Sequence, residues 1–217
     1  MHARWLVGVV AGILFGSHLV ASDLLTDEPF LEPRFVGEWW QIAENPDLGP
    51  LTSERQQVVD FGIWQAIDGT WQLWSCIRNT KETGHTRLFY RWEGRRLTEA
   101  SWTPRGIAMR ADVSYGEQPG GLQAPFVFST DGVFHMFYGG WERICLATSQ
   151  NGRDFLRNLN KDGKSVLFGP PEGFGNPRDP MVLRIGERWH CYFTAHTRDE
   201  GAVFCRTSGD LLNWSHV

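Results

Sequence analysis

Residues 123–140, QAPFVFSTDGVFHMFYGG, have a counterpart in residues 178–195, RDPMVLRIGERWHCYFTA. In each stretch a proline begins an apolar run, and a histidine follows ten residues after that proline, at His135 and at His190. The copies are about 55 residues apart, and a repeat of that length made of short strands is typical of β-propeller blades. Because blades surround a central axis, the repeat predicts that functional residues lie on the innermost strands.

A second repeated motif marks the outer end of each copy. It reads Ser-x-Asn/Asp-x-x-x-aromatic, and its members are Ser149, Asn151, Phe155, Ser208, Asp210 and Trp214. Residues 58–103 contain a similar succession of short apolar runs, with the hairpin signal Asp68-Gly69 between the first two. No stretch has the apolar period of a long amphipathic helix. The sequence therefore predicts an all-β chain.

The expected organisation has three parts. We predict a signal peptide at residues 1–22, an irregular lead-in at 23–57 that packs across a propeller edge, and a partial propeller at 58–217. The expected blades cover about 58–103, 122–157 and 178–217. Three blades do not close a ring, since propellers typically have four to eight. Either the chain is a truncated product, or the remainder is a separate chain, or the arc stays open.

The N-terminus has the features of a secretory signal. His2 and Arg4 precede an apolar run, and small residues near Ala21 or Ser22 offer a cleavage site. A retained membrane anchor is the alternative, although the apolar run is short for a bilayer. The mature protein is therefore expected to be secreted or periplasmic, with no membrane partner after cleavage.

Composition narrows the class of ligand. The net charge of −4 argues against a nucleic-acid partner, which would require a basic face. Aromatic residues make up 13% of the chain, a content that suits both packing between blades and stacking on sugar rings. We therefore expect a carbohydrate to be the partner.

The four cysteines allow two interpretations. Cys191 and Cys205 are equidistant from Arg198 in a predicted hairpin, so they either face each other as a disulfide or remain buried thiols. The spacing of Cys and His fits no zinc site. No cofactor is expected, and nothing in the sequence specifies ligands for a structural calcium ion.

The candidate site lies where the predicted innermost strands begin, at residues 58–66, 123–129 and 178–183. The polar residues there are Asp60, Gln123, Arg178 and Asp179. Carboxylates that converge from separate blades suit glycoside hydrolysis, in which one group protonates the leaving oxygen and another activates water or attacks the sugar. Asp60 lies in an apolar run and needs a partner or a function. Asp179 precedes a proline, where an aspartate also caps turns.

These stretches, together with TSGDLLNW at 207–214, resemble the five-bladed propeller glycoside hydrolases, the superfamily of families 43, 32, 68, 62 and 117. The resemblance covers roughly residues 58 to 217. It implies that Asp60 is the general base or nucleophile and that Asp179 stabilises the transition state or modulates pKa values. Arg178 would then pair with Asp179 or with a sugar hydroxyl.

The same resemblance leaves the general acid open. Gln123-Ala124-Pro125 stands where family 43 carries Glu-Gly-Pro, and glutamine has no proton to donate. The acid lies on an absent blade, or another residue serves, or the site binds sugars without cleaving them. The substitute candidates are Glu117, His135, His190 and His196, although the repetition of His135 and His190 also suits a structural role.

Further substrate contacts are expected from Arg178, Gln123, Trp64 and His196. Phe126, Trp39, Trp40 and Trp141 are additional aromatic candidates, each of which also suits packing. The sequence thus predicts an exported glycoside hydrolase that acts on oligo- or polysaccharides. The alternatives are a non-catalytic carbohydrate-binding propeller and a truncated inactive fragment.

Overall fold

A computed structural model describes residues 32–216. The chain divides into two compact units, residues 1–39 and 40–217, and the site lies in the second. The predicted signal peptide at 1–22 lies outside the described residues. Within the described part, no helix combines the length and apolar character needed to span a membrane.

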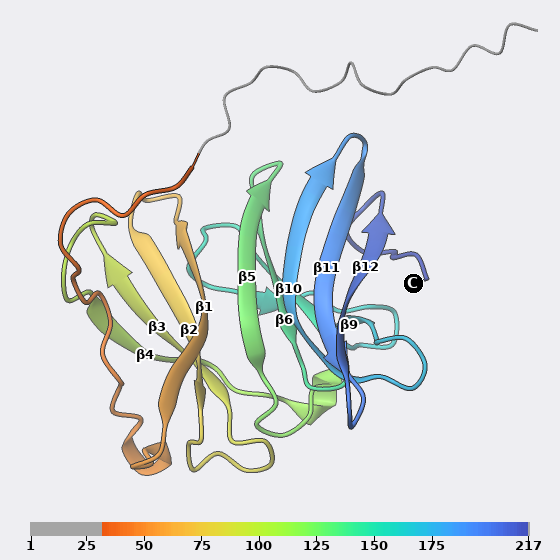
Figure 1. Cartoon of the computed structure of the whole chain (residues 1–217), viewed down its shortest axis with the longest axis horizontal. Helices are drawn as coiled ribbons and strands as arrows, with labels where there is room; N and C mark the ends of the chain where they lie inside the picture. Colours follow the sequence, from red (N-terminus) through yellow and green to blue (C-terminus); the bar gives the residue numbers. More distant parts are fainter. Residues whose placement is uncertain (1–31, 217) are drawn as a thin grey trace, which may run out of the picture. The chain divides into compact units, whose positions relative to one another are not determined.

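The second unit is built from three antiparallel sheets joined in chain order (Figure 1). The first sheet contains β1 (Gln57–Gln65), β2 (Trp71–Arg78), β3 (Leu88–Gly94) and β4 (Thr103–Met109). The second contains β5 (Gln123–Thr130), β6 (Val133–Gly139), β7 (Ile144–Ser149), β8 (Leu156–Arg157) and β9 (Val166–Phe168), which pairs with β7. The third contains β10 (Gly175–Ile185), β11 (Arg188–His196) and β12 (Gly201–Ser208).

Two short 3-10 helices, Gly49–Leu51 and Val113–Tyr115, are the only helical turns among the described residues. The prediction of an all-β chain is therefore confirmed. The first strand of each sheet, β1, β5 and β10, lies at the centre of the unit, and β5 packs against both of the others (Figure 1). Three successive sheets thus present their first strands to one shared region.

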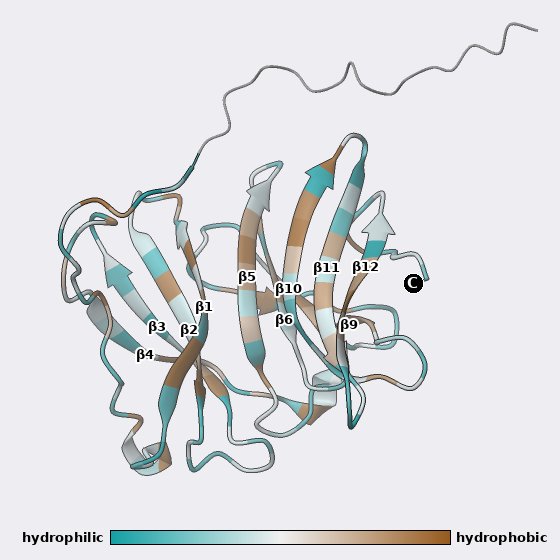
Figure 2. Cartoon of the chain, viewed as in Figure 1, coloured by the Kyte–Doolittle hydropathy of each residue, from teal (hydrophilic) through white to brown (hydrophobic). Residues whose placement is uncertain are grey.

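Hydrophobic cores lie between neighbouring sheets. The core between the first two includes Trp64, Trp74, Phe89, Met136 and Tyr138. The core between the second and third includes Phe137, Leu146, Phe168, Val182 and Phe193. Hydrophobic residues also line much of β5 and of the C-terminal half of β10 (Figure 2). Alternation along each strand sends one set of side chains into these cores.

The repeated Ser-x-Asn/Asp motif builds the same turn twice. The hydroxyl of Ser149 accepts a hydrogen bond from the backbone N–H of Gly152 (2.9 Å), and that of Ser208 accepts one from Leu211 (2.9 Å). The side-chain oxygen of Asn151 accepts hydrogen bonds from the backbone N–H groups of Arg153 and Asp154. In the third sheet, Asp210 accepts the equivalent hydrogen bonds from Leu212 and Asn213. The motif is therefore a turn that fixes the chain after β7 and β12.

The aromatic residue that ends each motif fills a core between sheets. Phe155 packs edge-on against Trp64 and Trp74, with ring centroids 5.7 and 5.3 Å away. Trp214 packs against Phe137 and Phe168 at 5.7 and 5.5 Å. The repeat visible in the sequence is thus a device that anchors the outer end of one sheet in the core it shares with the preceding sheet.

Residues 41–51 of the lead-in contact the first sheet. Backbone N–H groups of Ser101 and Trp102 donate to the carbonyls of Gln41 and Ile42, at 3.0 and 2.8 Å. Leu48 of the lead-in is buried in a third core, whose sheet residues include Leu73, Ile77, Leu88, Tyr90 and Trp92. This segment therefore covers apolar surface of the first sheet.

The disulfide interpretation of Cys191 and Cys205 is wrong, and all four cysteines are free. In the β11–β12 hairpin Cys191 pairs with Arg206, while Cys205 pairs with Tyr192. The register differs by one residue from the symmetric one, so the two thiols lie on opposite faces of the sheet. Burial raises the pKa of the thiols of Cys76 and Cys145 to about 12, which leaves them unreactive at neutral pH.

The first two sheets approach each other closely at Gly62 of β1. A Cβ atom at this position would lie 2.8 Å from the carbonyl oxygen of Pro125 in β5. No L side chain fits there without moving the backbone of one inner strand, so glycine sets the spacing between β1 and β5.

We predict that Gly62→Ala lowers the free energy of unfolding by about 1–3 kcal/mol, because the added methyl group overpacks the junction. Urea unfolding followed by tryptophan fluorescence measures the change. Gly209→Ala is the matched control, since a Cβ there meets nothing within 4 Å. Equal stability of the two variants would contradict this account of the junction.

Candidate active site

Each inner strand is interrupted by a β-bulge at the same place. The bulges leave Asp60, Ala124 and Asp179 with left-handed backbones, at φ values of 39°, 46° and 56°. Residues other than glycine rarely adopt this conformation, and such strain concentrates at functional sites. The three positions are therefore equivalent, and two of the three carry a carboxylate.

Each carboxylate-bearing bulge is contacted by a hydroxyl of the neighbouring strand. Ser75 of β2 donates to the carbonyl of Val59, the residue before Asp60, at 2.6 Å. Thr194 of β11 lies 3.3 Å from the carbonyl of Arg178, and its single proton is donated to the Asp179 carboxylate at 2.6 Å. A bulge removes regular ladder partners, and a side-chain hydroxyl supports the chain at both of these bulges.

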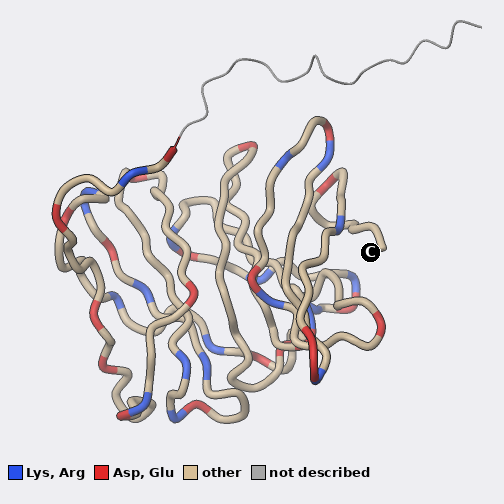
Figure 3. Tube along the Cα trace, viewed as in Figure 1, with Lys and Arg blue, Asp and Glu red and all other residues tan. Residues whose placement is uncertain are grey.

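Asp60 and Asp179 are close enough to influence each other's charge. Desolvation by the surrounding protein is the main cause that raises the pKa of Asp60, and the negative charge of Asp179 raises this pKa further. The Asp60 side chain is nevertheless exposed and available to a ligand. Acidic positions on β1 and β10 flank β5, and a basic position accompanies the one on β10 (Figure 3).

Positive charge near this pair comes from three arginines. The guanidinium groups of Arg87, Arg78 and Arg178 all act to lower the pKa of Asp60. Desolvation and the charge of Asp179 are stronger, so this pKa is raised overall. Arg178 also lies 3.6 Å from the carboxylate of Asp179 through its Nε atom. The negative charge of the two carboxylates is therefore partly balanced by guanidinium groups.

Asp179 is held in a fixed orientation. The hydroxyl of Thr194 donates a hydrogen bond of 2.6 Å to one carboxylate oxygen, Oδ2. The Nη1 atom of Arg178 donates to the carbonyl of Asn176 at 3.3 Å, which keeps the guanidinium beside β10. Asp179 is still exposed, so its carboxylate can face a ligand while these contacts orient it.

A chain of polar side chains joins the beginning of β5 to the end of β11. Gln123, which is 2% exposed, donates from its amide to Asn176 Oδ1 at 2.6 Å. The Nδ2 atom of Asn176 lies 3.4 Å from Nε2 of His196, whose Nδ1 lies 2.8 Å from the carbonyl of Thr197. Gln123 is thus held by a hydrogen bond within the protein, and His196 is the exposed end of this row of polar side chains.

The expectation that Trp64 contacts substrate is corrected by its position. Trp64 is 6% exposed, and its indole N–H donates to the carbonyl of Gly152 at 2.6 Å. Its ring packs against those of Trp74 and Phe155 in the core of the first two sheets. Alternation along β1 sends Trp64 into that core, so it holds two sheets together and does not line the site.

Three of the four substitute general acids have structural roles. Glu117 is 1% exposed and forms two hydrogen bonds of 2.7 Å with Arg157. His135 and His190 each place Nδ1 against the carbonyl two residues earlier, at 3.2 and 3.3 Å, which supports the structural interpretation of their repetition. His196 is the histidine that remains near the beginnings of β5 and β10.

Two of the other expected aromatic contacts have packing partners within the protein. Trp141 stacks on His85 with ring centroids 3.6 Å apart, and Phe126 packs against the second core. A pocket of about 520 Å³ lies at the lead-in edge of the first sheet, not beside Asp60. Among the described residues, no group of three or more His, Cys, Asp or Glu side chains could hold a metal ion.

Sequence comparison finds a curated relative. No protein-family model matches the chain. A curated protein of Psychromonas ingrahamii, named as a probable sucrose-6-phosphate hydrolase, is 28% identical over 193 residues, which make up 82% of this chain and 32% of that protein. The chain therefore spans about a third of the length of this curated relative.

Solved structures show the same fold at low sequence identity. The sucrose-6-phosphate hydrolase of Lactobacillus gasseri has a TM-score of 0.56 and 16% identity, over 73% of this chain and 33% of that one. A family 117 glycoside hydrolase of Zobellia galactanivorans has a TM-score of 0.58 and 11% identity, over 82% and 59%. The chain thus has the fold of the propeller glycoside hydrolases, as the motifs predicted, with three sheets of the ring in the described part.

We predict that Asp60→Asn stabilises the protein at pH 7. The folded state raises the pKa of Asp60, so ionisation of this carboxylate costs stability. That cost is absent below the unfolded-state pKa and is complete above the folded-state value. Thermal unfolding should therefore show a higher Tm for the variant at pH 7 and no difference near about pH 3.

Asparagine tolerates the left-handed backbone, so the substitution adds no strain at the bulge. Asp162→Asn, in an exposed turn, is the control. A lower Tm for Asp60→Asn than for the parent at pH 7 would show that the carboxylate supports the fold.

Proposed function

We propose that the protein is a glycoside hydrolase whose catalytic carboxylates are Asp60 and Asp179. The observation that carries this proposal is the pair of bulges that present two exposed carboxylates from separate sheets within reach of each other's charge. Two carboxylates flanking a sugar are the usual requirement for cleavage of a glycosidic bond. The fold shared with glycoside hydrolases adds support.

Asp60 acts at the anomeric carbon, either as the base that deprotonates water or as the nucleophile. Its raised pKa makes it a stronger base than an ordinary aspartate. Asp179, oriented by Thr194, stabilises the positive charge that develops on the sugar ring. Arg178 is placed to donate to a sugar hydroxyl or to Asp179.

The leaving-group oxygen needs a proton, and His196 is the candidate that the geometry favours. It is exposed, and the chain from Gln123 through Asn176 fixes its ring near the inner strands. As an imidazolium, the ring would have a proton on Nε2 that it could donate to the leaving group. Substrates whose leaving group needs little protonation, such as 4-nitrophenyl glycosides, are accordingly the first to test.

The printed names of the relatives suggest which sugars to include. One solved relative is a β-fructofuranosidase of Bombyx mori, and another is a sucrose-6-phosphate hydrolase. The curated relative is named as a probable sucrose-6-phosphate hydrolase. We therefore include sucrose, sucrose 6-phosphate and fructo-oligosaccharides beside a panel of aryl glycosides.

We predict that Asp60→Asn lowers kcat by between about 10² and 10⁴, because the amide can neither accept a proton nor attack. Release of 4-nitrophenol or of reducing sugar measures the rate, and Asp162→Asn serves as the charge-matched control. Hydrolysis that survives Asp60→Asn unchanged, or no hydrolysis of any substrate by the parent, would refute the assignment.

A second function, carbohydrate binding without cleavage, is favoured by the buried Gln123 amide at the position of the family 43 acid. It requires that the parent protein binds sugars and hydrolyses none of them. Binding that is retained in Asp60→Asn/Asp179→Asn, together with an inactive parent, would select this alternative.

We also propose that the protein is exported, on the basis of the apolar N-terminal run that follows Arg4. Expression in a bacterial host with intact secretion should yield a mature chain that begins after Ala21 or Ser22, as measured by intact mass. A mature chain that retains Met1 in the cell interior would contradict this proposal.

A further inference from the structure

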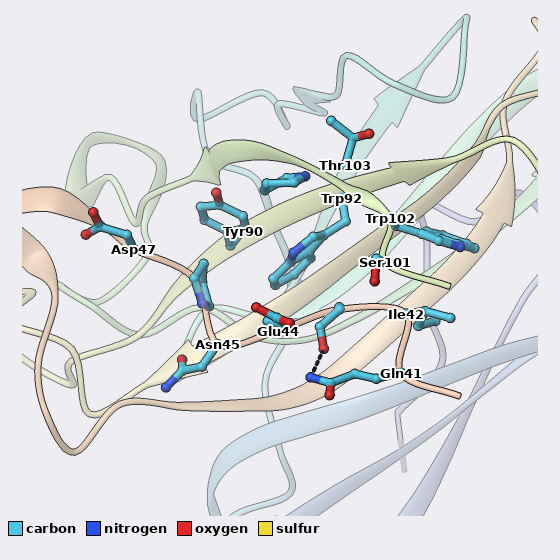
Figure 4. A pocket seen from close by; sticks show the side chains of 13 residues that line it. Gln41, Ile42, Glu44, Asn45, Asp47, Tyr90, Trp92, Ser101, Trp102 and Thr103 are labelled. Carbon is cyan, nitrogen blue, oxygen red and sulfur yellow. Dashed lines mark hydrogen bonds between the residues drawn. The ribbon is translucent and has the colours of Figure 1, made fainter. Parts of the chain in front are cut away.

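A pocket of about 520 Å³ lies between the lead-in and the first sheet. This volume is within the range of small-molecule sites. Figure 4 shows Tyr90 and Trp92 of β3 on one side and Gln41, Glu44 and Asn45 of the lead-in on the other. The remaining lining residues are Ile42, Ala43, Pro46, Asp47, Ser101, Trp102, Thr103 and Pro104.

The pocket is formed by backbone that is already fixed. Hydrogen bonds from Ser101 and Trp102 to the lead-in close one end of it. At the other end, the amide of Asn45 donates to the carbonyl of Gln56 at 3.1 Å and accepts from the Gln56 side chain at 3.0 Å. A ligand would therefore meet a preformed cavity, which reduces the entropy lost on binding.

Several polar groups on the pocket wall are free to bind a ligand. The side-chain oxygens of Glu44, Tyr90, Ser101 and Thr103 make no hydrogen bond with the described residues. Asp47, in contrast, already accepts from the backbone of Gly49 and from the Thr52 hydroxyl, both at 2.8 Å. The available set thus consists of three hydroxyls, which both donate and accept, and one carboxylate, which accepts.

The charge of the wall excludes anionic ligands. No Lys, Arg or His side chain lines the pocket, whereas two carboxylates do. Tyr90 and Trp92, which are 6% and 2% exposed, have ring centroids 4.7 Å apart and form the apolar inner side of the pocket. Aromatic surface beside hydroxyl and carboxylate oxygens matches a molecule with apolar C–H faces and many neutral hydroxyl groups.

We propose that this pocket is a second carbohydrate-binding site, specific for neutral saccharides and separate from the carboxylate site. The Glu44 carboxylate accepts hydrogen bonds from sugar hydroxyls, the Tyr90 hydroxyl both donates and accepts them, and Trp92 contributes apolar contact. The proposal is independent of hydrolysis, since none of the lining residues belongs to the proposed catalytic set.

The test uses the full chain with Asp60→Asn/Asp179→Asn, so that turnover at the other site is suppressed. Neutral xylo-, arabino-, malto- and fructo-oligosaccharides are titrated, with sucrose 6-phosphate and oligogalacturonate as anionic probes. Isothermal calorimetry measures affinity, and intrinsic tryptophan fluorescence reports the pocket. We expect saturable binding of at least one neutral saccharide, and none of the anionic probes.

Glu44→Ala and Tyr90→Phe should each weaken that binding by about tenfold or more, through loss of one hydrogen-bonding group. Glu172→Ala and Tyr192→Phe remove comparable groups elsewhere and should leave it unchanged. If Tyr90→Phe is unstable by thermal unfolding, Ser101→Ala replaces it.

Three results would overturn the proposal: no binding of any neutral saccharide, binding that Glu44→Ala and the second variant leave unchanged, or preferential binding of the anionic probes. Failure of the hydrolysis proposal is recognised separately, because it requires an inactive parent protein in which Asp60 and Asp179 are intact.

Discussion

The geometry of the site depends on one backbone constraint, the left-handed residue at the bulge of each inner strand. Such a conformation costs on the order of 1–3 kcal/mol for a residue other than glycine and persists only where its surroundings impose it. Ser75 supplies part of this constraint by holding the carbonyl of Val59, and Thr194 does so by holding the carboxylate of Asp179. The same bulges turn Asp60 and Asp179 out of the regular alternation, which would otherwise send side chains into a core or onto a sheet face.

The contacts between sheets keep the inner strands in register with one another. Aromatic residues at the motif ends fill the two cores, and Gly62 lets β1 approach the backbone of β5. Arg153, on the turn after β7, adds ion pairs to Asp68 and Glu93 of the first sheet, at 2.7 and 2.8 Å. Because Glu93 is buried, these ion pairs constrain the orientation of the first two sheets as well as attracting them to each other. A shift of one sheet would therefore displace one carboxylate relative to the other.

The sequence reveals the parts of this structure that depend on local pattern. Strand alternation, turn residues and the repeat identify the all-β chain and its inner strands, and the apolar surroundings of Asp60 mark it as unusual. The sequence does not reveal the equivalence of Ala124 with the two aspartates, because that depends on bulges in three separate ladders. It also misplaces Trp64, since which face of β1 meets the second sheet is a tertiary property. The lead-in pocket, likewise, requires two segments about 50 residues apart to be paired.

The single-residue offset in the β11–β12 hairpin has a practical consequence for folding. Because Cys191 and Cys205 lie on opposite faces of the sheet and all four thiols are free, no covalent cross-link contributes to the native state. Refolding then needs neither an oxidant nor a disulfide isomerase, and the equilibrium is the same in excess reductant. The cohesion of the three sheets is supplied entirely by noncovalent packing, hydrogen bonds and ion pairs.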